Sequence, residues 1–269
     1  MAKISQIKIG ETSYDLNCKK LGNHNNNYLA NCPTLGTNVN LEVQANKSST
    51  ISSTSTTSQY PTAKSVLSAV LSCYKFTDTY QAVEYIESTG TQHIDTKFRP
   101  NNNTRVLMQY SVNSAPGVLA LFGARDGTTS NNFNVWLDGL TCIKPQYYNN
   151  DYNSKSVSYT YAANQKVIVD FNKNICNFGT ASQTFTNTTF QGNYTIALFT
   201  VNSGGTIDSR KASVKMYSCQ IWDNETLVRN FIPCYRKSDN VIGMFDAKNG
   251  LFYTNGGTGT FNKGANITI

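Results

Sequence analysis

The sequence has few of the residues on which catalytic and metal sites are usually built. Its 269 residues include only two histidines, and charged residues make up 14% of the chain. The seven cysteines form no CxxC pair. No apolar run approaches the roughly 20 residues that a membrane-spanning helix needs. These shortages argue against a zinc centre and against a membrane protein.

The sequence also has no concentrated charge. The formal net charge is +7, but the basic residues are scattered rather than gathered in a patch or stripe. A nucleic-acid binder usually concentrates such charge on one face, so we expect no nucleic-acid partner. Because no signal peptide precedes the odd number of cysteines, we expect synthesis in reducing cytoplasm with mostly free thiols.

The sequence is rich in aromatic and strand-forming residues. From residue 76 onwards, short apolar segments are separated by clusters of Asn, Gly, Asp and Ser. About a dozen such segments over roughly 190 residues, with no helix-length period, predict a two-sheet antiparallel β-sandwich, most naturally a jelly roll. Examples are TRVLMQYSV, QKVIVDF, SVKMYSCQIWD and TLVRNFIPC. We assign residues 76–269 to this mainly-β domain.

Residues 1–47 form a different part. The segments ISQIKIG and ETSYDL predict two short strands around Gly10, since apolar and polar residues alternate in both. The rest of this part has no usable periodicity and is too short to bury a core alone. We therefore expect residues 1–47 to be an anchor that orders on another protein. The apolar residues of its two strands are Ile7, Ile9, Tyr14 and Leu16.

A Ser/Thr-rich tract at 48–60 predicts a flexible linker, and residues 61–75 then predict one short helix beginning at Pro61. Apolar residues recur in this segment at spacings of three and four. A helix of this length is marginal alone in water, so it packs either within its own chain or against copies of itself. We expect self-association, as a trimer or a dimer. The stripe consists of Ala63, Val66, Leu67, Val70 and Tyr74.

Four segments in order carry a resemblance to a known family. They are VEYIESTGTQHIDTKFRPNNNTRV (83–106), LFGAR (121–125), VKMYSCQIWDNETLVRNFIPCYR (214–236) and VIGMFDAKNGLFYTNGGTGTF (241–261). Together they resemble a domain of bacteriophage virion proteins that is similar to laminin-G and concanavalin-A-like jelly rolls. IKIGETSYDL (7–16) and SQYPTAKSV (58–66) resemble the leader and the spacer-and-helix element of phage fibre proteins.

The resemblance implies a structural virion protein, assembled in the bacterial host and exposed on the virion surface. We expect a short head fibre, trimeric, held by residues 1–47 to a capsid protein, with the jelly roll outward. A tail-associated receptor-binding fibre is the alternative. The Asn-rich style suggests a phage of gut Bacteroidetes, with crAss-like phages among the candidates.

The acidic residues do not form a glycoside hydrolase pattern. Retaining hydrolases of this fold class present two carboxyl groups about 5 Å apart. Glu84 and Glu87 are three residues apart, so in a strand they face opposite sides, and Asp138, Asp170 and Asp223 stand singly. We expect no enzymatic activity; a polysaccharide-degrading enzyme is the least favoured reading.

A glycan site is the binding hypothesis that the sequence supports. The loops 125–132 and 147–153 combine aromatic rings with amide and carboxylate groups, which suit sugar faces and hydroxyls, and loop oxygens of this kind sometimes hold Ca²⁺. No other cofactor is expected. An Asn-rich surface yields such loops by chance, so both readings stay open. The candidate residues are Tyr147, Tyr148, Asn149, Asn150, Asp151 and Tyr152.

The remaining conspicuous residues have structural explanations. We expect His93 to be a half-buried residue of a strand, and the glycine-rich segment 255–259 to be a turn rather than a phosphate cradle, because no helix follows it. Trp136 and Trp222 lie inside strand patterns, and we expect both in the core.

Overall fold

The computed structural model describes residues 76–268, apart from 115–116, 128 and 150–154, together with four short strands before them. The chain divides into two compact units, Met1–Leu71 and Ser72–Ile269, which are described separately. Within the described residues, no helix has the length and apolar character needed to cross a lipid bilayer.

The described residues of the first unit form two pairs of strands. β1 (Gln6–Ile9) pairs antiparallel with β2 (Thr12–Asp15), which confirms the two strands expected there. β3 (Lys47–Ser48) pairs in parallel with β4 (Tyr60–Pro61). Pro61 therefore lies in a strand and is not the first residue of a helix. The helix stripe, Ala63, Val66, Leu67, Val70 and Tyr74, lies outside the described residues, as do Leu16 and the side chains of Ile7, Ile9 and Tyr14.

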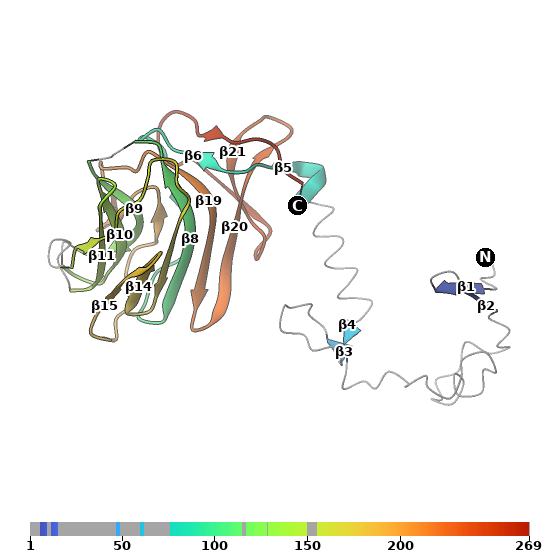
Figure 1. Cartoon of the computed structure of the whole chain (residues 1–269), viewed down its shortest axis with the longest axis horizontal. Helices are drawn as coiled ribbons and strands as arrows, with labels where there is room; N and C mark the ends of the chain where they lie inside the picture. The colour runs from blue at the N-terminus through green and yellow to red at the C-terminus, as the bar shows by residue number, and fades with distance from the viewer. Residues whose placement is uncertain are drawn as a thin grey trace. The chain divides into compact units, whose positions relative to one another are not determined.

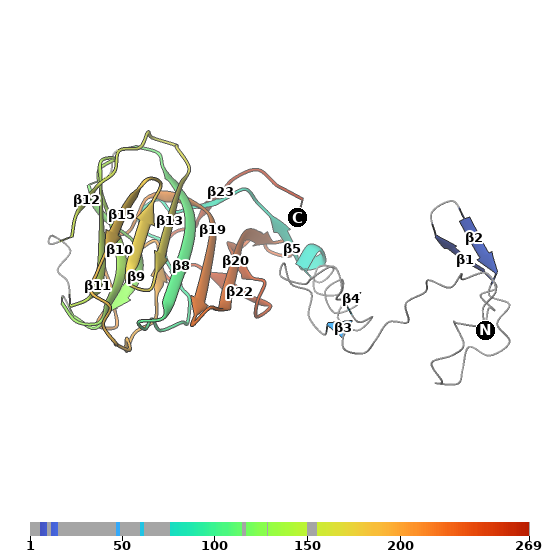
Figure 2. The ribbon, with the colours of Figure 1, turned by 60° about the horizontal axis from the view of Figure 1, so that its bottom comes forward.

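The second unit is built on two sheets that lie face to face (Figures 1 and 2). The smaller sheet has the strand order β12-β11-β10-β9-β16-β7, and β17 and β18 are attached beside β9. Its strands are β7 (Ile94–Asp95), β9 (Val118–Arg125), β10 (Asn132–Asp138), β11 (Cys142–Tyr148), β12 (Val157–Ser158), β16 (Ala197–Leu198), β17 (Asn202–Ser203) and β18 (Thr206–Ile207).

The larger sheet has the order β15-β14-β13-β8-β19-β20-β21-β22, with β5, β6 and β23 attached to it. Apart from the parallel contact of β17 with β9, the pairings of both sheets are antiparallel, so the expected β-sandwich is confirmed. The strands of the larger sheet are β5 (Tyr80–Ala82), β6 (Ile86–Glu87), β8 (Thr104–Val112), β13 (Val167–Asn172), β14 (Ile175–Phe178), β15 (Ala181–Thr184), β19 (Val214–Asp223), β20 (Thr226–Arg236), β21 (Ile242–Asp246), β22 (Leu251–Thr254) and β23 (Asn262–Lys263).

The core lies between the sheets because successive strand residues point to opposite faces. In β8 the buried residues Val106 and Met108 alternate with the half-buried Leu107 and Gln109. From the other sheet, Phe133 stacks on Phe171 with ring centres 4.3 Å apart. Burying each such large apolar side chain stabilises the fold by about 1.5–3 kcal/mol, so the interleaved rings fix how the two sheets pack.

A second, smaller core forms where the chain enters the sandwich. Residues 76–79 are helical rather than strand, which corrects the expectation of strands alone from residue 76. Phe76 packs edge-on against Phe245 at 4.9 Å, and Tyr80 lies 4.9 Å from Phe252. The C-terminal end joins the same place, because the Ile267 amide donates to the Ala82 carbonyl at 3.0 Å, and Figure 1 shows the C-terminus beside this helical turn.

The cysteines of the sandwich behave as small apolar residues. Cys142, Cys176, Cys219 and Cys234 are free thiols, and all but Cys142 are buried. Burial raises the pKa of the Cys176 and Cys219 thiols, and that of Cys234 to about 12. A thiol that stays protonated is a poor nucleophile and metal ligand, so these three serve packing.

Candidate functional site

The predicted glycan loop is only partly a loop. Tyr147 is 0% exposed because the alternation of β11 turns its side chain into the core. Its ring packs edge-on against Phe190 at 5.2 Å, and its hydroxyl donates to the Thr188 carbonyl at 3.1 Å. Tyr147 therefore cannot stack on a sugar, and that prediction is wrong.

Two of the other five candidate residues, Tyr148 and Asn149, are described by the structure. Tyr148 is half-buried, with a φ of 53° at the end of β11 and its ring 6.1 Å from that of Phe190. Asn149 is exposed. Asn150, Asp151 and Tyr152 lie outside the described residues, so their role stays a prediction.

The second predicted loop, 125–132, uses its carboxylate internally. Asp126 accepts hydrogen bonds from the Asn193 amide nitrogen at 2.9 Å, from Asn193 Nδ2 at 2.7 Å and from Asn131 Nδ2 at 2.8 Å. Both of its oxygens thus hold neighbouring chain segments together. In the described part of the chain no group of three or more His, Cys, Asp and Glu residues is placed to hold a metal ion.

His93 and the glycine-rich segment form one structural unit. Asn255 Oδ1 accepts from the amides of His93 at 3.1 Å and of Gly257 at 2.7 Å, which closes the segment as the expected turn. His93 is 9% exposed, and burial lowers the pKa of its imidazole. A Cβ on Gly256 would lie 2.8 Å from His93 Nε2, so glycine is needed where this turn covers the ring.

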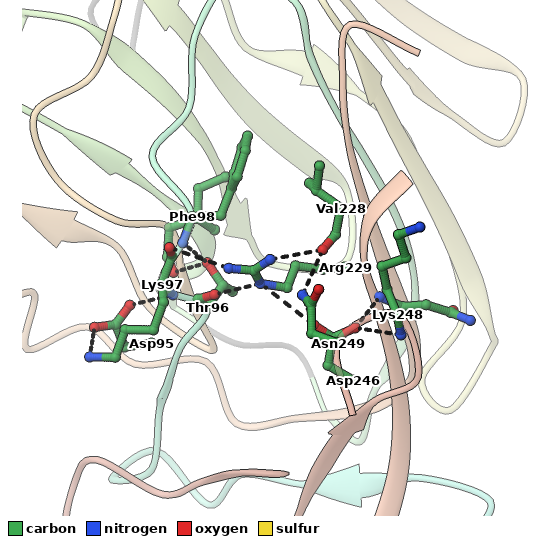
Figure 3. Close-up of polar contacts among 11 residues, drawn as sticks. Asp95, Thr96, Lys97, Phe98, Val228, Arg229, Asp246, Lys248 and Asn249 are labelled. Atoms are coloured by element: carbon green, nitrogen blue, oxygen red, sulfur yellow. Dashed lines mark hydrogen bonds and ion pairs between the residues drawn. The ribbon is translucent and has the colours of Figure 1, made fainter. Parts of the chain in front are cut away.

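The larger sheet carries a network that resembles a site (Figure 3). The fully buried Asp246 accepts hydrogen bonds from the amides of Asn230 at 2.8 Å and Lys248 at 3.0 Å. Asn249 Nδ2 donates to its other oxygen at 2.7 Å, and Arg229 Nε lies 3.7 Å from that same oxygen. The carboxylate thus holds the turn between β21 and β22.

Arg229 extends this network to the other sheet. Its guanidinium donates to the carbonyls of Thr96 at 2.9 Å and Val228 at 2.8 Å (Figure 3). Thr96 directly follows β7 of the smaller sheet. Because the guanidinium and the carboxylate both bind groups of the protein itself, the network is a brace between the sheets rather than a ligand site.

The outer side of the larger sheet presents an open polar and aromatic surface. The side chains that alternate with the core residues of β8, β13 and β19 lie there, and together they are here named the β8 face. Ile168 of β13, which pairs with Gln109 of β8, is 50% exposed, and the face is not covered by the other sheet. The β8 face consists of Arg105, Leu107, Gln109, Ile168, Asp170, Tyr217, Gln220 and Trp222.

One end of the β8 face is built around Trp222. Arg105 donates from Nε and from Nη2 to the two oxygens of Asp170, both at 2.8 Å. Its guanidinium carbon lies 4.8 Å from the centre of the Trp222 ring. The hydrogen bonds to Asp170 raise the pKa of Arg105. Trp222 is half-buried, not in the core as expected, because it falls on the outward positions of β19.

The opposite end is built around Tyr217. Lys166 Nζ lies 4.3 Å from the centre of the Tyr217 ring, and the Tyr85 ring meets it edge-on at 5.5 Å. The Tyr217 hydroxyl lies 3.1 Å from Ser111 Oγ. Tyr217 lies at a bulge of β19 and is five positions from Trp222, so the two stand roughly 15 Å apart along the strand.

Sequence reasoning missed the β8 face because its members come from distant segments. Arg105 and Asp170 are 65 residues apart in the chain and meet only through the pairing of β13 with β8. The usable signal was the alternation in TRVLMQYSV, which places Arg105, Leu107 and Gln109 on one side.

No protein-family model and no curated protein matches the chain. Among solved structures, the crystal structure of a proposed carbohydrate-binding protein from Bacteroides ovatus ATCC 8483 is similar, with 12% sequence identity and a TM-score of 0.47. The match covers 70% of this chain and spans 62% of the length of that chain. The β-sandwich assignment rests on the strand pairing above, and the resemblance to phage virion proteins stays a prediction.

Proposed function

We propose that the sandwich domain binds carbohydrate through the β8 face. The observation that carries this proposal is one open sheet surface with an aromatic ring at each end, Trp222 and Tyr217, and amide and charged side chains between them. Aromatic faces match the C–H faces of sugars, while Gln109, Gln220 and Arg105 can hydrogen-bond hydroxyl groups. A span of roughly 15 Å fits an extended glycan better than a single sugar.

One end of the β8 face lies far from the point where the chain enters the sandwich, which favours access of a ligand to that end. At one end of β20, Arg236 pairs with β5, where the chain enters the sandwich. Near the other end of β20, Leu227 pairs with Trp222 of β19. Nine residues of strand separate these two points, or about 30 Å. The Trp222 end of the β8 face is therefore remote from the point where the chain enters the sandwich.

We infer binding without catalysis at this face. Asp170 is the carboxylate of the β8 face, and both of its oxygens already accept hydrogen bonds from Arg105. A glycoside hydrolase needs a pair of carboxyl groups with separate acid and nucleophile or base roles, and this arrangement supplies one carboxylate bound to a guanidinium.

The test is glycan binding by the full chain. We expect signal on a microarray of plant, animal and bacterial glycans, with polymers favoured over monosaccharides. For the strongest glycan, Trp222→Ala should weaken binding by about tenfold or more, because truncation of a central aromatic contact commonly costs over 1 kcal/mol. Isothermal titration would give the affinities.

Leu251→Ala is the matched control, since Leu251 is 55% exposed in β22 of the same sheet and lies outside the β8 face. It should bind like the unaltered chain. Equal weakening in both variants, or no glycan bound at all, would rule out the β8 face as the site. Release of reducing sugar from a bound glycan would refute the non-catalytic reading.

We further propose that the protein is a virion component, a short head fibre, with a tail-associated fibre as the alternative. The four segments that resemble phage virion proteins support this, and so do the short N-terminal strands and the division into two compact units. Several copies on one fibre would raise the effective concentration of weakly binding faces.

This proposal predicts an oligomer held by the helix stripe. Light scattering of the full chain should give a trimer, or a dimer, and Leu67→Glu combined with Val70→Glu should give a monomer, because charges at the stripe cannot be buried. Ser65→Glu with Ser68→Glu, on the other side of the expected helix, is the control. A monomer before any substitution would exclude the multivalent fibre.

A further inference from the structure

The outer side of the smaller sheet carries a second polar cluster, and this one is buried. In β10, Phe133 and Val135 face the core, so Asn134 and Trp136 face outward. Asn134 is nevertheless 0% exposed and Trp136 is 1% exposed. Trp136 packs with Ala120 and Val201 in a small cluster separate from the main core.

Trp136 is the centre of this arrangement. Its Nε1 donates to Asn134 Oδ1 at 2.7 Å and to Gln146 Oε1 at 3.0 Å. The guanidinium carbons of Arg210 and Arg125 lie 4.3 Å and 5.4 Å from the centre of its ring. These residues, together with Asp208, are here named the Trp136 cluster.

The Asp208 carboxylate forms ion pairs with the guanidinium groups of both Arg210 and Arg125. It accepts from Arg210 Nε at 3.1 Å and Nη2 at 2.9 Å, while Arg125 Nη2 reaches the same carboxylate only at 3.5 Å. The Arg125 side chain is 10% exposed, and its Nε donates to Ser203 Oγ at 2.9 Å. Burial lowers the pKa of Arg125, which reflects the cost of a guanidinium with a long ion pair.

Besides Arg125, with its long ion pair, Asn134 also carries a hydrogen-bond donor that is not fully used. Its Nδ2 is buried and has no hydrogen-bond partner. A buried donor left unsatisfied costs about 1–3 kcal/mol, and native structures rarely keep one without a reason. Gly123 of β9, which pairs with Asn134, leaves room for this side chain, because a Cβ at Gly123 would lie 2.1 Å from the Asn134 Cβ.

We propose that the Trp136 cluster is a second ligand site, separate from the β8 face, that takes a sugar acid. The carboxylate of the sugar pairs with the guanidinium of Arg125, and a sugar oxygen accepts the unused hydrogen bond of Asn134 Nδ2. Arg210, whose side chain is 41% exposed, turns from the Trp136 ring toward the ligand. The unused donor of Asn134 then has an acceptor, and the Arg125 guanidinium gains a closer anion than Asp208.

The chain's two tryptophans make a direct test possible. Trp222→Phe leaves Trp136 as the remaining tryptophan, so emission excited at a wavelength that tyrosine does not absorb reports this cluster alone and does not depend on glycan binding at the β8 face. Sodium glucuronate should change the emission in a saturable way at constant ionic strength. Glucose, which has the same ring without the carboxylate, and sodium acetate, which has the carboxylate without the ring, should each bind at least about tenfold more weakly.

Asn134→Leu in the same background removes the unused donor while filling its volume. It also removes one acceptor of Trp136 Nε1, but Gln146 Oε1 remains as the other. It should fold as well as its parent by thermal unfolding and weaken glucuronate binding by about tenfold. Should this variant fail to fold, chemical shifts of the unaltered chain with glucuronate give the same answer, because changes are expected in β9, β10 and residues 208–210. An absent response, an equal response to glucose or acetate, or full binding by Asn134→Leu would overturn the proposal.

Discussion

Replacing Arg229 by methionine should lower the free energy of unfolding by about 3–5 kcal/mol. Asp246 is 0% exposed and the Arg229 side chain is 16% exposed. Methionine keeps much of the side-chain volume but leaves a buried carboxylate without its cation. It also removes the donor to the Thr96 carbonyl, which joins the two sheets. Because the ion pair is long, at 3.7 Å, we expect the lower end of this range.

Equilibrium unfolding of the full chain in urea would measure the effect. Lys248→Met is the control, because the Lys248 side chain is exposed and only its backbone amide binds Asp246; it should change stability by less than about 0.5 kcal/mol. Asp246→Asn in the Arg229→Met background should recover part of the loss. A loss below about 1 kcal/mol in Arg229→Met would contradict the brace.

Gly123→Ala should have a comparable or larger effect, at least about 4 kcal/mol. Gly123 has a φ of 140°, and a Cβ there would lie 2.1 Å from Asn134 Cβ and 2.5 Å from the Phe133 carbonyl oxygen. Neither atom can move away alone, because the Asn134 Cβ is bonded directly to the backbone and the Phe133 carbonyl oxygen is part of the backbone of β10. The strand pair β9–β10 would have to separate.

Gly117→Ala is the matched control, because a Cβ at Gly117 meets nothing within 4 Å. Thermal unfolding should separate the two variants clearly, with Gly117→Ala close to the unaltered chain. Adding Asn134→Gly to Gly123→Ala should restore only part of the stability, because the contact with the Phe133 carbonyl remains. Equal stability of the two alanine variants would contradict the close approach seen here.

The sequence by itself determined the architecture of the sandwich domain. The strand-like segments TRVLMQYSV and SVKMYSCQIWD predicted β8 (Thr104–Val112) and β19 (Val214–Asp223), although Trp222 of β19 lies outside the core in which it was expected. It also predicted the pair β1 and β2. A side-chain period of two is a local property, so a single segment suffices to read it.

Only the tertiary structure decided where functional groups meet. Tyr147 was assigned to a loop from the sequence, although it is a core residue of β11 (Cys142–Tyr148), a strand that contains Pro145; proline is uncommon inside strands. The pairing of Arg105 with Asp170 across β8 and β13, and the gathering of two arginines at Trp136, depend on strand order and register. These are set by long-range packing, and a shift of one residue would turn every side chain of a strand to the other face.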